Sequence, residues 1–319
     1  MKRKTFLFGL CLSLLTLTVA AQGREVLLEK SFPNKRTVNI KTISGDCLFK
    51  RGTTDSITVL VVAELSPAGA VETVVSEEGT ALTLQERWVR DHSSGNILWT
   101  ITLPEGATVN ASSLSGDITG EDLKGEFKGK TASGDILISR CEGSFSLRSA
   151  SGDLTLKNVQ GSLSLNTASG DITLNKTKGE TRASLASGDL SAEDAQGSLH
   201  FSLASGDGDV DVTVTGPSSF RTASGDMKVS LNKSPSADLS VASASGDASL
   251  NFKGNPMNGI FEMTARKREG RIVAPFSFEK QETFTEWGEE YEKKSVRRGG
   301  SSVKISLSTA TGRVEILER

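Results

Sequence analysis

The residues whose type and spacing could do chemistry are eight aspartates, each the last residue of a Ser-Gly-Asp tripeptide. The first six recur every 18 residues, and the last two follow at intervals of 19 and 21. If one interval is one turn of a solenoid, the carboxylates line up along a corner about 4.8 Å apart. Carboxylates that close repel one another, which favours a shared cation such as Ca²⁺. This candidate calcium ladder consists of Asp117, Asp135, Asp153, Asp171, Asp189, Asp207, Asp226 and Asp247.

A purely structural role for these aspartates competes with calcium binding. Each corner offers one Asp beside one Ser, whereas calcium-binding β-rolls carry more glycine and pair ligands from adjacent turns. A turn aspartate also accepts backbone N–H groups and thereby fixes its own corner. The glycine of each tripeptide is expected to supply a backbone angle that other residues resist. We therefore favour a repeated corner over a repeated site, and we predict no metal, no cofactor and no catalytic residue.

The remaining residues do not predict a site for nucleophilic catalysis. The two histidines, His92 and His200, show no recognised spacing to a serine or cysteine, so a Ser-His-Asp site is not predicted. Clusters with zinc-ligand spacing are absent. Cys47 falls at an inward strand position and Cys141 in a turn, so the two sulfurs are not expected to meet in a disulfide.

The elements that position the aspartates follow from the apolar pattern of one repeat, residues 161–178. Leu163 and Leu165, then Ile172 and Leu174, alternate with polar residues at period two. Each repeat is therefore two short strands, which bury their apolar faces only when repeats stack and pair in parallel. We predict an all-β fold, a single-stranded right-handed parallel β-helix (solenoid) with ~18-residue rungs. Such a rung has a perimeter under roughly 60 Å and encloses no tunnel, so function must lie on outer faces, turns or ends.

The rest of the chain reads as looser versions of this repeat. Residues 22–105 are expected to form irregular N-terminal β rungs, and the motif already occurs there at residues 43–46. Residues 106–254 form the regular Ser-Gly-Asp β-helix. Residues 255–319 contain a charged insertion (279–298), interpreted as a shield for the solenoid's end, and a closing rung. The prediction is one continuous solenoid over residues 22–319.

An exported protein is predicted from the first residues of the chain. Lys2, Arg3 and Lys4 precede an apolar run and a small-residue cleavage pattern, which indicates a signal peptide at residues 1–21. Cys11 lies inside this segment and is not expected to carry a lipid. Loss of the segment changes the formal net charge from −2 to −5, which argues against nucleic-acid binding. No later segment is apolar enough for a membrane span. We expect a periplasmic, cell-surface or secreted protein.

Three motifs resemble a known bacterial family. They are the serial Thr-Ala-Ser-Gly-Asp-Ile pattern (residues 167–172), the lead-in Leu103-Pro104-x-Gly106, and the closing Gly299-Gly300 followed by Ser308 to Gly312. Together they resemble the bacterial putative-adhesin family, a domain of unknown function with a Ser-Gly-Asp β-strand repeat. The resemblance covers essentially all of the mature chain and implies a β-helix at the cell envelope. It brings no shared catalytic or ligand residues with it.

The function expected from these observations is that of a non-enzymatic scaffold. Outer faces rich in Ser, Thr, Asn, Lys and Asp suit shallow, multivalent contacts with a glycan or an envelope protein. One alternative is a carbohydrate-active β-helix enzyme (polysaccharide lyase or hydrolase), with a groove built by the N-terminal or 279–298 loops. Another is a periplasmic envelope-stress component. A local site is expected where the series breaks: in the loops before Ser115, at the enlarged corner Gly208-Asp209, or in the charged insertion before Val303.

Overall fold

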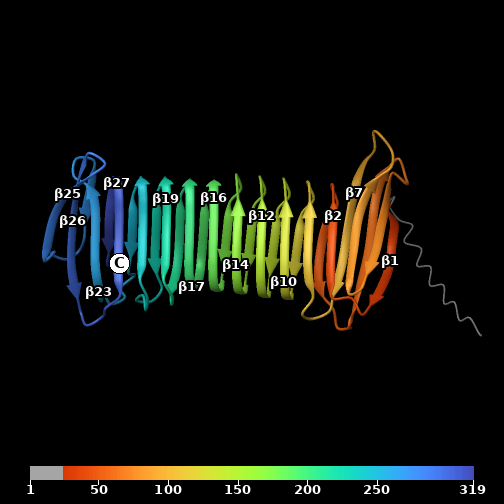
Figure 1. Ribbon diagram of the computed structural model, residues 1–319, viewed down its shortest axis with the longest axis horizontal. Coiled ribbons are helices and arrows are strands. Elements are labelled where there is room, and N and C mark those ends of the chain that lie inside the picture. The colour runs from red at the N-terminus through yellow and green to blue at the C-terminus, as the bar shows by residue number, and fades with distance from the viewer. Residues whose placement is uncertain (1–23) are drawn as a thin grey trace, which may run out of the picture.

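The protein is an elongated stack of β-strands (Figure 1). The computed structural model describes residues 24–319, so the predicted signal peptide at residues 1–21, including Cys11, lies outside the described residues. Within residues 24–319 there are 27 strands, and no helix occurs among them. No helix in this range could therefore cross a bilayer. The predicted all-β, solenoid-like architecture is confirmed.

The strands form two series, which we call the first and second ladders, and the long strands β17 and β27 take part in both. The first ladder contains, in spatial order, β5 (Val71–Glu78), β6 (Ala81–Trp88), β2 (Thr37–Thr42), β8 (Thr108–Ser113), β10 (Lys124–Thr131), β12 (Glu142–Ser149), β14 (Gln160–Thr167), β16 (Lys178–Ser187), β17 (Leu190–Ser205), β19 (Ser218–Ser224), β21 (Leu239–Ser245), β27 (Lys304–Leu317), β23 (Gly259–Arg266), β26 (Glu289–Arg298) and β25 (Lys280–Glu286).

The second ladder runs beside it, also from the N-terminal to the C-terminal end. Its strands are β1 (Glu25–Pro33), β4 (Ser56–Ser66), β7 (Ser94–Leu103), β3 (Asp46–Arg51), β9 (Ile118–Glu121), β11 (Ile136–Ser139), β13 (Leu154–Lys157), β15 (Ile172–Asn175), β17, β18 (Gly208–Val214), β20 (Met227–Leu231), β22 (Ala248–Asn251), β27 and β24 (Gly270–Val273).

Residues 18 apart pair in parallel through the middle of both ladders. Phe127 pairs with Phe145 and Phe145 with Leu163 in the first ladder, and Leu154 pairs with Ile172 in the second. All four of the inward positions predicted for residues 161–178 are buried. Aromatic rings stack from rung to rung as well, with the Phe127 and Phe145 centroids 6.4 Å apart. Burial of each large apolar side chain stabilises the stack by about 1.5–3 kcal/mol.

Both ends of the stack are built from chain that returns out of sequence order. At the N-terminal end, β2 lies between β6 and β8, while β3 lies between β7 and β9. At the C-terminal end, β27 lies between β21 and β23 in the first ladder and between β22 and β24 in the second. Figure 1 shows both arrangements. The last strand in sequence is therefore not the last in the stack, because the insertion that precedes it forms the end.

Antiparallel strands finish each end. At the N-terminal end β4 pairs antiparallel with β1 and β7, and β5 pairs with β6. At the C-terminal end β26 pairs antiparallel with β23 and β25. Within the described residues, antiparallel strands thus bound both ladders at the N-terminal end and the first ladder at the C-terminal end, which limits the open edges available for unwanted strand pairing. The second ladder ends on β24, which pairs in parallel with β27.

The glycines of the Ser-Gly-Asp corners are needed for close approach of neighbouring rungs. Gly152 does not have a left-handed backbone, but a Cβ built there would overlap the carbonyl oxygen of Gly134. Only from Gly188 onwards do these glycines also adopt a positive φ, 117° at Gly188 itself. The expectation that glycine supplies a special backbone angle is therefore wrong for the first corners. The opposite corner does use that conformation, and there non-glycine residues adopt it, such as Arg140 with φ 54°.

Replacement of Gly152 by Ala tests this role. Because the added methyl group meets the backbone of Gly134 on the preceding rung, we expect Gly152→Ala to lower the free energy of unfolding by about 1–3 kcal/mol in urea denaturation. Gly300→Ala is the matched control, since no atom lies within 4 Å of a Cβ at Gly300. The control should change stability by less than about 0.5 kcal/mol. Equal effects of the two substitutions would contradict the close-approach role.

Candidate functional site

The predicted aspartates do line up, and each carboxylate is already used inside the stack. One oxygen of every Asp accepts the backbone N–H of the corresponding residue one rung further on. The series also takes in Asp46 before Asp117 and ends at Arg313 after Asp247. The eight bonds between the nine aspartates and the final bond to the Arg313 N–H have lengths of 2.9, 2.8, 2.8, 2.8, 2.8, 2.8, 2.7, 2.9 and 2.7 Å. The carboxylate therefore fastens the next rung, where the sequence suggested that it fixes its own turn.

A second polar series, which the sequence did not reveal, holds the glycines of the first four corners, Gly116, Gly134, Gly152 and Gly170. The N–H of Gly134 donates to Thr131 Oγ1 at 2.8 Å, and that of Gly152 donates to Ser149 Oγ at 2.7 Å. These hydroxyls are buried, unlike the serines of the tripeptide itself. The only signal in the sequence is a recurring Ser or Thr two residues before that serine, which is easily taken for an ordinary strand residue.

Glu86 takes over this role at the N-terminal end of the stack. Its buried carboxylate accepts the N–H of Gly45 at 3.1 Å, the N–H of Ser44 at 3.3 Å and the indole N–H of Trp88 at 2.5 Å. Three donors satisfy a charge that would otherwise be costly to bury. Glu86 is therefore a structural residue that closes the corner series, and its oxygens are not directed at a solvent-filled site.

Calcium has no ready-made site along the aspartate corner. In residues 24–319 no three side chains of His, Cys, Asp or Glu are grouped to hold a metal ion. One oxygen of each carboxylate is committed to a backbone N–H, and a Ca²⁺ ion prefers six to eight oxygen ligands. The corner geometry therefore favours the structural role, and the calcium alternative is left for experiment to decide.

Melting experiments distinguish the two roles of the aspartate corner. Because the carboxylates already accept backbone donors, we expect the thermal midpoint to be the same in millimolar Ca²⁺ and in excess chelator. A stabilising ion at a hundred times its dissociation constant would add about 2.7 kcal/mol to the free energy of unfolding. An upward shift of the midpoint with Ca²⁺, reversed by chelator, would restore the calcium ladder.

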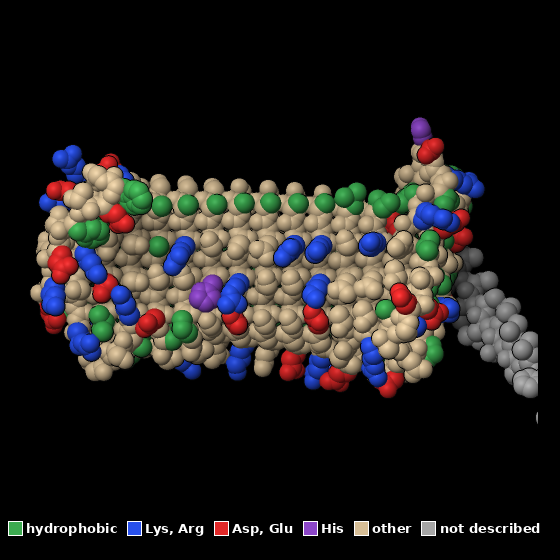
Figure 2. Space-filling model, in the orientation of Figure 1, with side chains coloured by type: hydrophobic (Ala, Val, Ile, Leu, Met, Phe, Trp, Pro, Cys, Tyr) green, Lys and Arg blue, Asp and Glu red, His purple; other side chains and the backbone are tan. Residues whose placement is uncertain are grey.

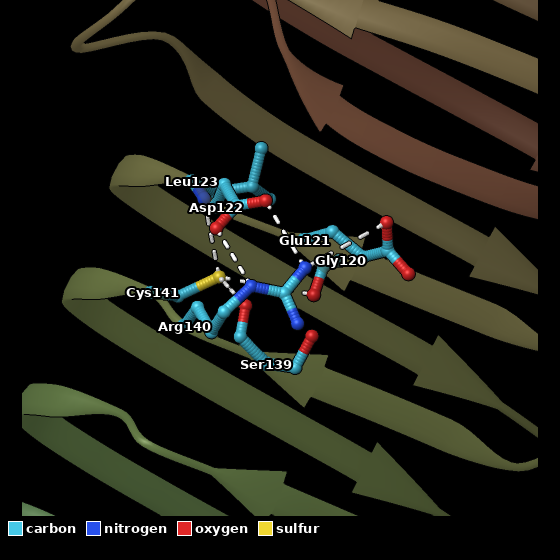
Figure 3. Close-up of polar contacts among 7 residues, drawn as sticks. All are labelled: Gly120, Glu121, Asp122, Leu123, Ser139, Arg140 and Cys141. Carbon is cyan, nitrogen blue, oxygen red and sulfur yellow. Dashed lines mark hydrogen bonds and ion pairs between the residues drawn. The ribbon is translucent and has the colours of Figure 1, made fainter.

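The two cysteines are free, and both are buried. Cys141 lies in the corner after β11, beside the ion pair in which Arg140 donates to both oxygens of Asp122, at 2.8 and 3.1 Å (Figure 3). Its sulfur accepts the Leu123 N–H at 3.2 Å and donates to the Ser139 carbonyl at 3.1 Å. Burial raises the pKa of the Cys141 thiol to about 11, and that of Cys47 to about 12. Both sulfurs are therefore protonated thiols, which are poor nucleophiles at neutral pH.

Thiol labelling tests this assignment. With both pKa values raised and both side chains buried, we expect neither Cys47 nor Cys141 to react with a disulfide reagent in the folded chain at pH 8. Both should react within seconds once urea unfolds the chain, because an exposed thiol returns to a pKa near 8.5. Rapid labelling of one thiol per folded chain would identify a reactive cysteine and contradict the structural role.

The histidines do not build a catalytic centre. His92 is exposed in a turn. His200 lies on the outside of β17, and its Nε2 is 3.4 Å from Ser198 Oγ, a contact that the sequence did not predict. However, Ser198 Oγ donates its proton to the Pro217 carbonyl at 2.7 Å. This serine is therefore not activated by the histidine as a nucleophile would be.

The outer face of the first ladder gathers unpaired cations in a row. Lys41, Ser112, Lys130 and Arg148 occupy successive places in register across β2, β8, β10 and β12. Arg221 lies in the same row four rungs further on. We call Lys41, Lys130 and Arg148 the cation row; Figure 2 shows blue side chains crossing this face below a line of green ones.

Neighbouring cations on this face are neutralised, and those of the cation row are not. Lys128 pairs with Glu126 at 2.6 Å, and Arg182 pairs with Glu180 at 2.5 Å. Within the part of the chain that the structure describes, Lys41, Lys130 and Arg148 have no ion pair. An exposed cation without an acidic neighbour is available to an outside partner at little cost.

A groove of about 490 Å³ opens beside the cation row. Its lining includes Asn39, Asn110, Gln85, Ser112 and the flanking lysines. The Asn110 side-chain amide donates to the Asn39 side-chain oxygen at 2.9 Å, which orders both amides in the wall. The groove is polar and shallow, and most of its lining lies before Ser115, the region where the sequence placed one of the possible local sites, although on strand faces instead of in loops.

The aromatic residues in and just before the charged insertion fall into a packed group and an exposed group. Phe276 and Phe278 pack against the core, and the Arg298 guanidinium lies over the Phe276 ring at 4.7 Å. Trp287 projects from the β25–β26 turn with 94% of its surface exposed. Phe284, which stacks on Tyr291, is also exposed, so the insertion both closes the stack and displays aromatic side chains to a partner.

Comparison with known proteins identifies one family model and several similar structures. The model of the Toastrack DUF4097 family matches residues 36–265 and 199–317. A "putative adhesin" from Parabacteroides distasonis is 11% identical, with a TM-score of 0.47, over 91% of this chain and 96% of that chain. A "putative adhesin" from Bacteroides fragilis is 10% identical, with a TM-score of 0.33, over 93% and 98%. A "putative lipid binding protein" from Parabacteroides distasonis is 9% identical, with a TM-score of 0.35, over 92% and 97%. No curated protein matches this chain.

Proposed function

Because this chain belongs to the Toastrack DUF4097 family, we propose that it is an exported scaffold, without catalytic activity, that binds another macromolecule at the cell envelope. The partner is a glycan or an envelope protein, and the contact lies on the outer surface of the solenoid. Export follows from the predicted signal peptide, which places the mature chain in the periplasm, at the cell surface or in the medium.

One observation carries this proposal: the outer face of the first ladder is long and polar, with unpaired cations. The interior offers no alternative, because apolar side chains from both ladders fill it. A regular face repeats similar groups from rung to rung, so weak contacts add up along an extended partner. This arrangement suits adhesion better than the capture of a small molecule, which requires a deep apolar pocket.

The absence of catalysis is part of the proposal, and the chemistry of the side chains supports it. The corner carboxylates are held by backbone donors, Ser198 donates to a carbonyl, and both thiols stay protonated. A glycosidase instead needs two carboxyl groups on either side of a bound sugar. We also propose that residues 22–319 form one continuous right-handed β-helix, since parallel crossovers are almost always right-handed.

Binding to isolated envelopes tests the proposal. We expect the purified mature chain to bind envelopes of the producing bacterium saturably. Periodate treatment of the envelopes, which destroys sugars, and protease treatment, which removes proteins, identify the class of partner. A parallel assay follows the release of reducing ends from envelope polysaccharide. Absence of saturable binding would contradict the scaffold, and release of sugar products would contradict the non-enzymatic role.

A further inference from the structure

We propose that the cation row and the adjoining groove bind the carboxylate groups of an acidic polysaccharide that lies along the solenoid axis. This inference rests on the proposed function and gives it a ligand class and a place. The site comprises Lys41, Lys130 and Arg148, with the groove between the two lysines. None of these residues belongs to a Ser-Gly-Asp corner.

The groove exists because a small residue separates two long ones. Ser112 stands in register between Lys41 and Lys130, so its short side chain leaves the space between the two ammonium groups open. Gln85 continues the same row beyond Lys41, and Asn39 and Asn110 form the adjacent row. A chain of sugars laid here meets the unpaired Lys41 and Lys130 on one side, and on the other it meets the two amides and Lys128, which is paired with Glu126.

The spacing of the cations fits a polymer better than a single small anion. Neighbouring rungs are about 4.8 Å apart, so Lys41 and Lys130, two rungs apart, are separated by about 10 Å along the axis. Arg148 follows one rung later. A lone carboxylate reaches one of these groups, whereas a linear chain with a carboxylate on successive units reaches all three. The gain from simultaneous contacts is large even when each exposed ion pair is weak.

The neighbouring groups favour a polysaccharide over other polyanions. Amide and hydroxyl groups of Asn39, Asn110, Gln85 and Ser112 can both donate to and accept from sugar hydroxyls. The groove lining contains no aromatic side chain on which a nucleic-acid base could stack.

An acidic peptide has no strand edge to join at this place. Strands β6, β2, β8 and β10 are each paired on both sides, so a peptide could not extend the sheet here by backbone hydrogen bonds. Recognition must then come from side chains alone. That suits a glycan, which presents hydroxyl and carboxylate groups along its whole length.

Calorimetric titration of the mature chain tests the site. The probes are oligogalacturonate, alginate and hyaluronate fragments, with neutral galactan and poly-L-glutamate of matched length for comparison. We expect the acidic sugars to bind with an affinity that falls as salt rises, because the contacts are exposed ion pairs. The double variant Lys130→Gln/Arg148→Gln should bind them about five- to tenfold more weakly.

The control removes a positive charge from the same face but off the row. Arg182→Gln removes a cation from the same face that is already paired with Glu180, and it should leave affinity within about twofold. All three substituted side chains are exposed, so the melting temperature of each variant should match that of the unchanged chain.

Each outcome separates this inference from the proposed function. Failure of every acidic sugar to bind, equal binding of polyglutamate or of neutral galactan, or unchanged affinity in the double variant would overturn the polysaccharide site. Envelope binding that persists undiminished in the double variant would overturn the site and leave the scaffold standing. Binding of acidic sugars by a chain that does not bind envelopes would support the site and contradict the scaffold.

Discussion

Contact between the backbones of successive corners is the constraint on which the rest of this structure depends. At each corner the glycine lies against the carbonyl oxygen of the preceding glycine, and the next N–H reaches the preceding aspartate. A side chain at that position would hold two rungs apart and weaken the parallel pairing of both ladders. The regular rung spacing follows from this contact. The outer faces are straight for the same reason, so outward side chains that are in register stay aligned from rung to rung.

The pattern of a single repeat is enough to predict much of the architecture. The alternation of Leu163, Leu165, Ile172 and Leu174 predicts two inward-facing strands, and the constant interval predicts parallel stacking. The backbone N–H that each aspartate carboxylate accepts could not be predicted. The same Ser-Gly-Asp tripeptide is compatible with a carboxylate that binds its own turn and with one that binds the next rung. Only the distance from each Oδ1 to the next backbone nitrogen decides between them.

The strand order at the ends and the candidate site could not be predicted either, because both depend on contacts between segments that are far apart in the sequence. Ile305 and Leu307 have the alternation of any rung, so nothing in their pattern says that the insertion before them lies outside them. The groove places Lys41 beside Ser112, which is 71 residues away and becomes its neighbour only through the return of the chain at the N-terminal end. Loops attracted attention in the sequence, while the unpaired charges lie on the outer faces of strands.

The position of β27 has a consequence for the order in which the stack is completed. The residues of β27 are synthesised after those of β21, β22, β23 and β24, yet β27 lies between these earlier strands. Until β27 is in place, β21 and β22 keep an unsatisfied edge, and β23 has no parallel neighbour. This end of the stack can therefore close only after β27 has been synthesised and inserted. A prematurely terminated chain would carry open strand edges, the feature by which incomplete β proteins associate with one another.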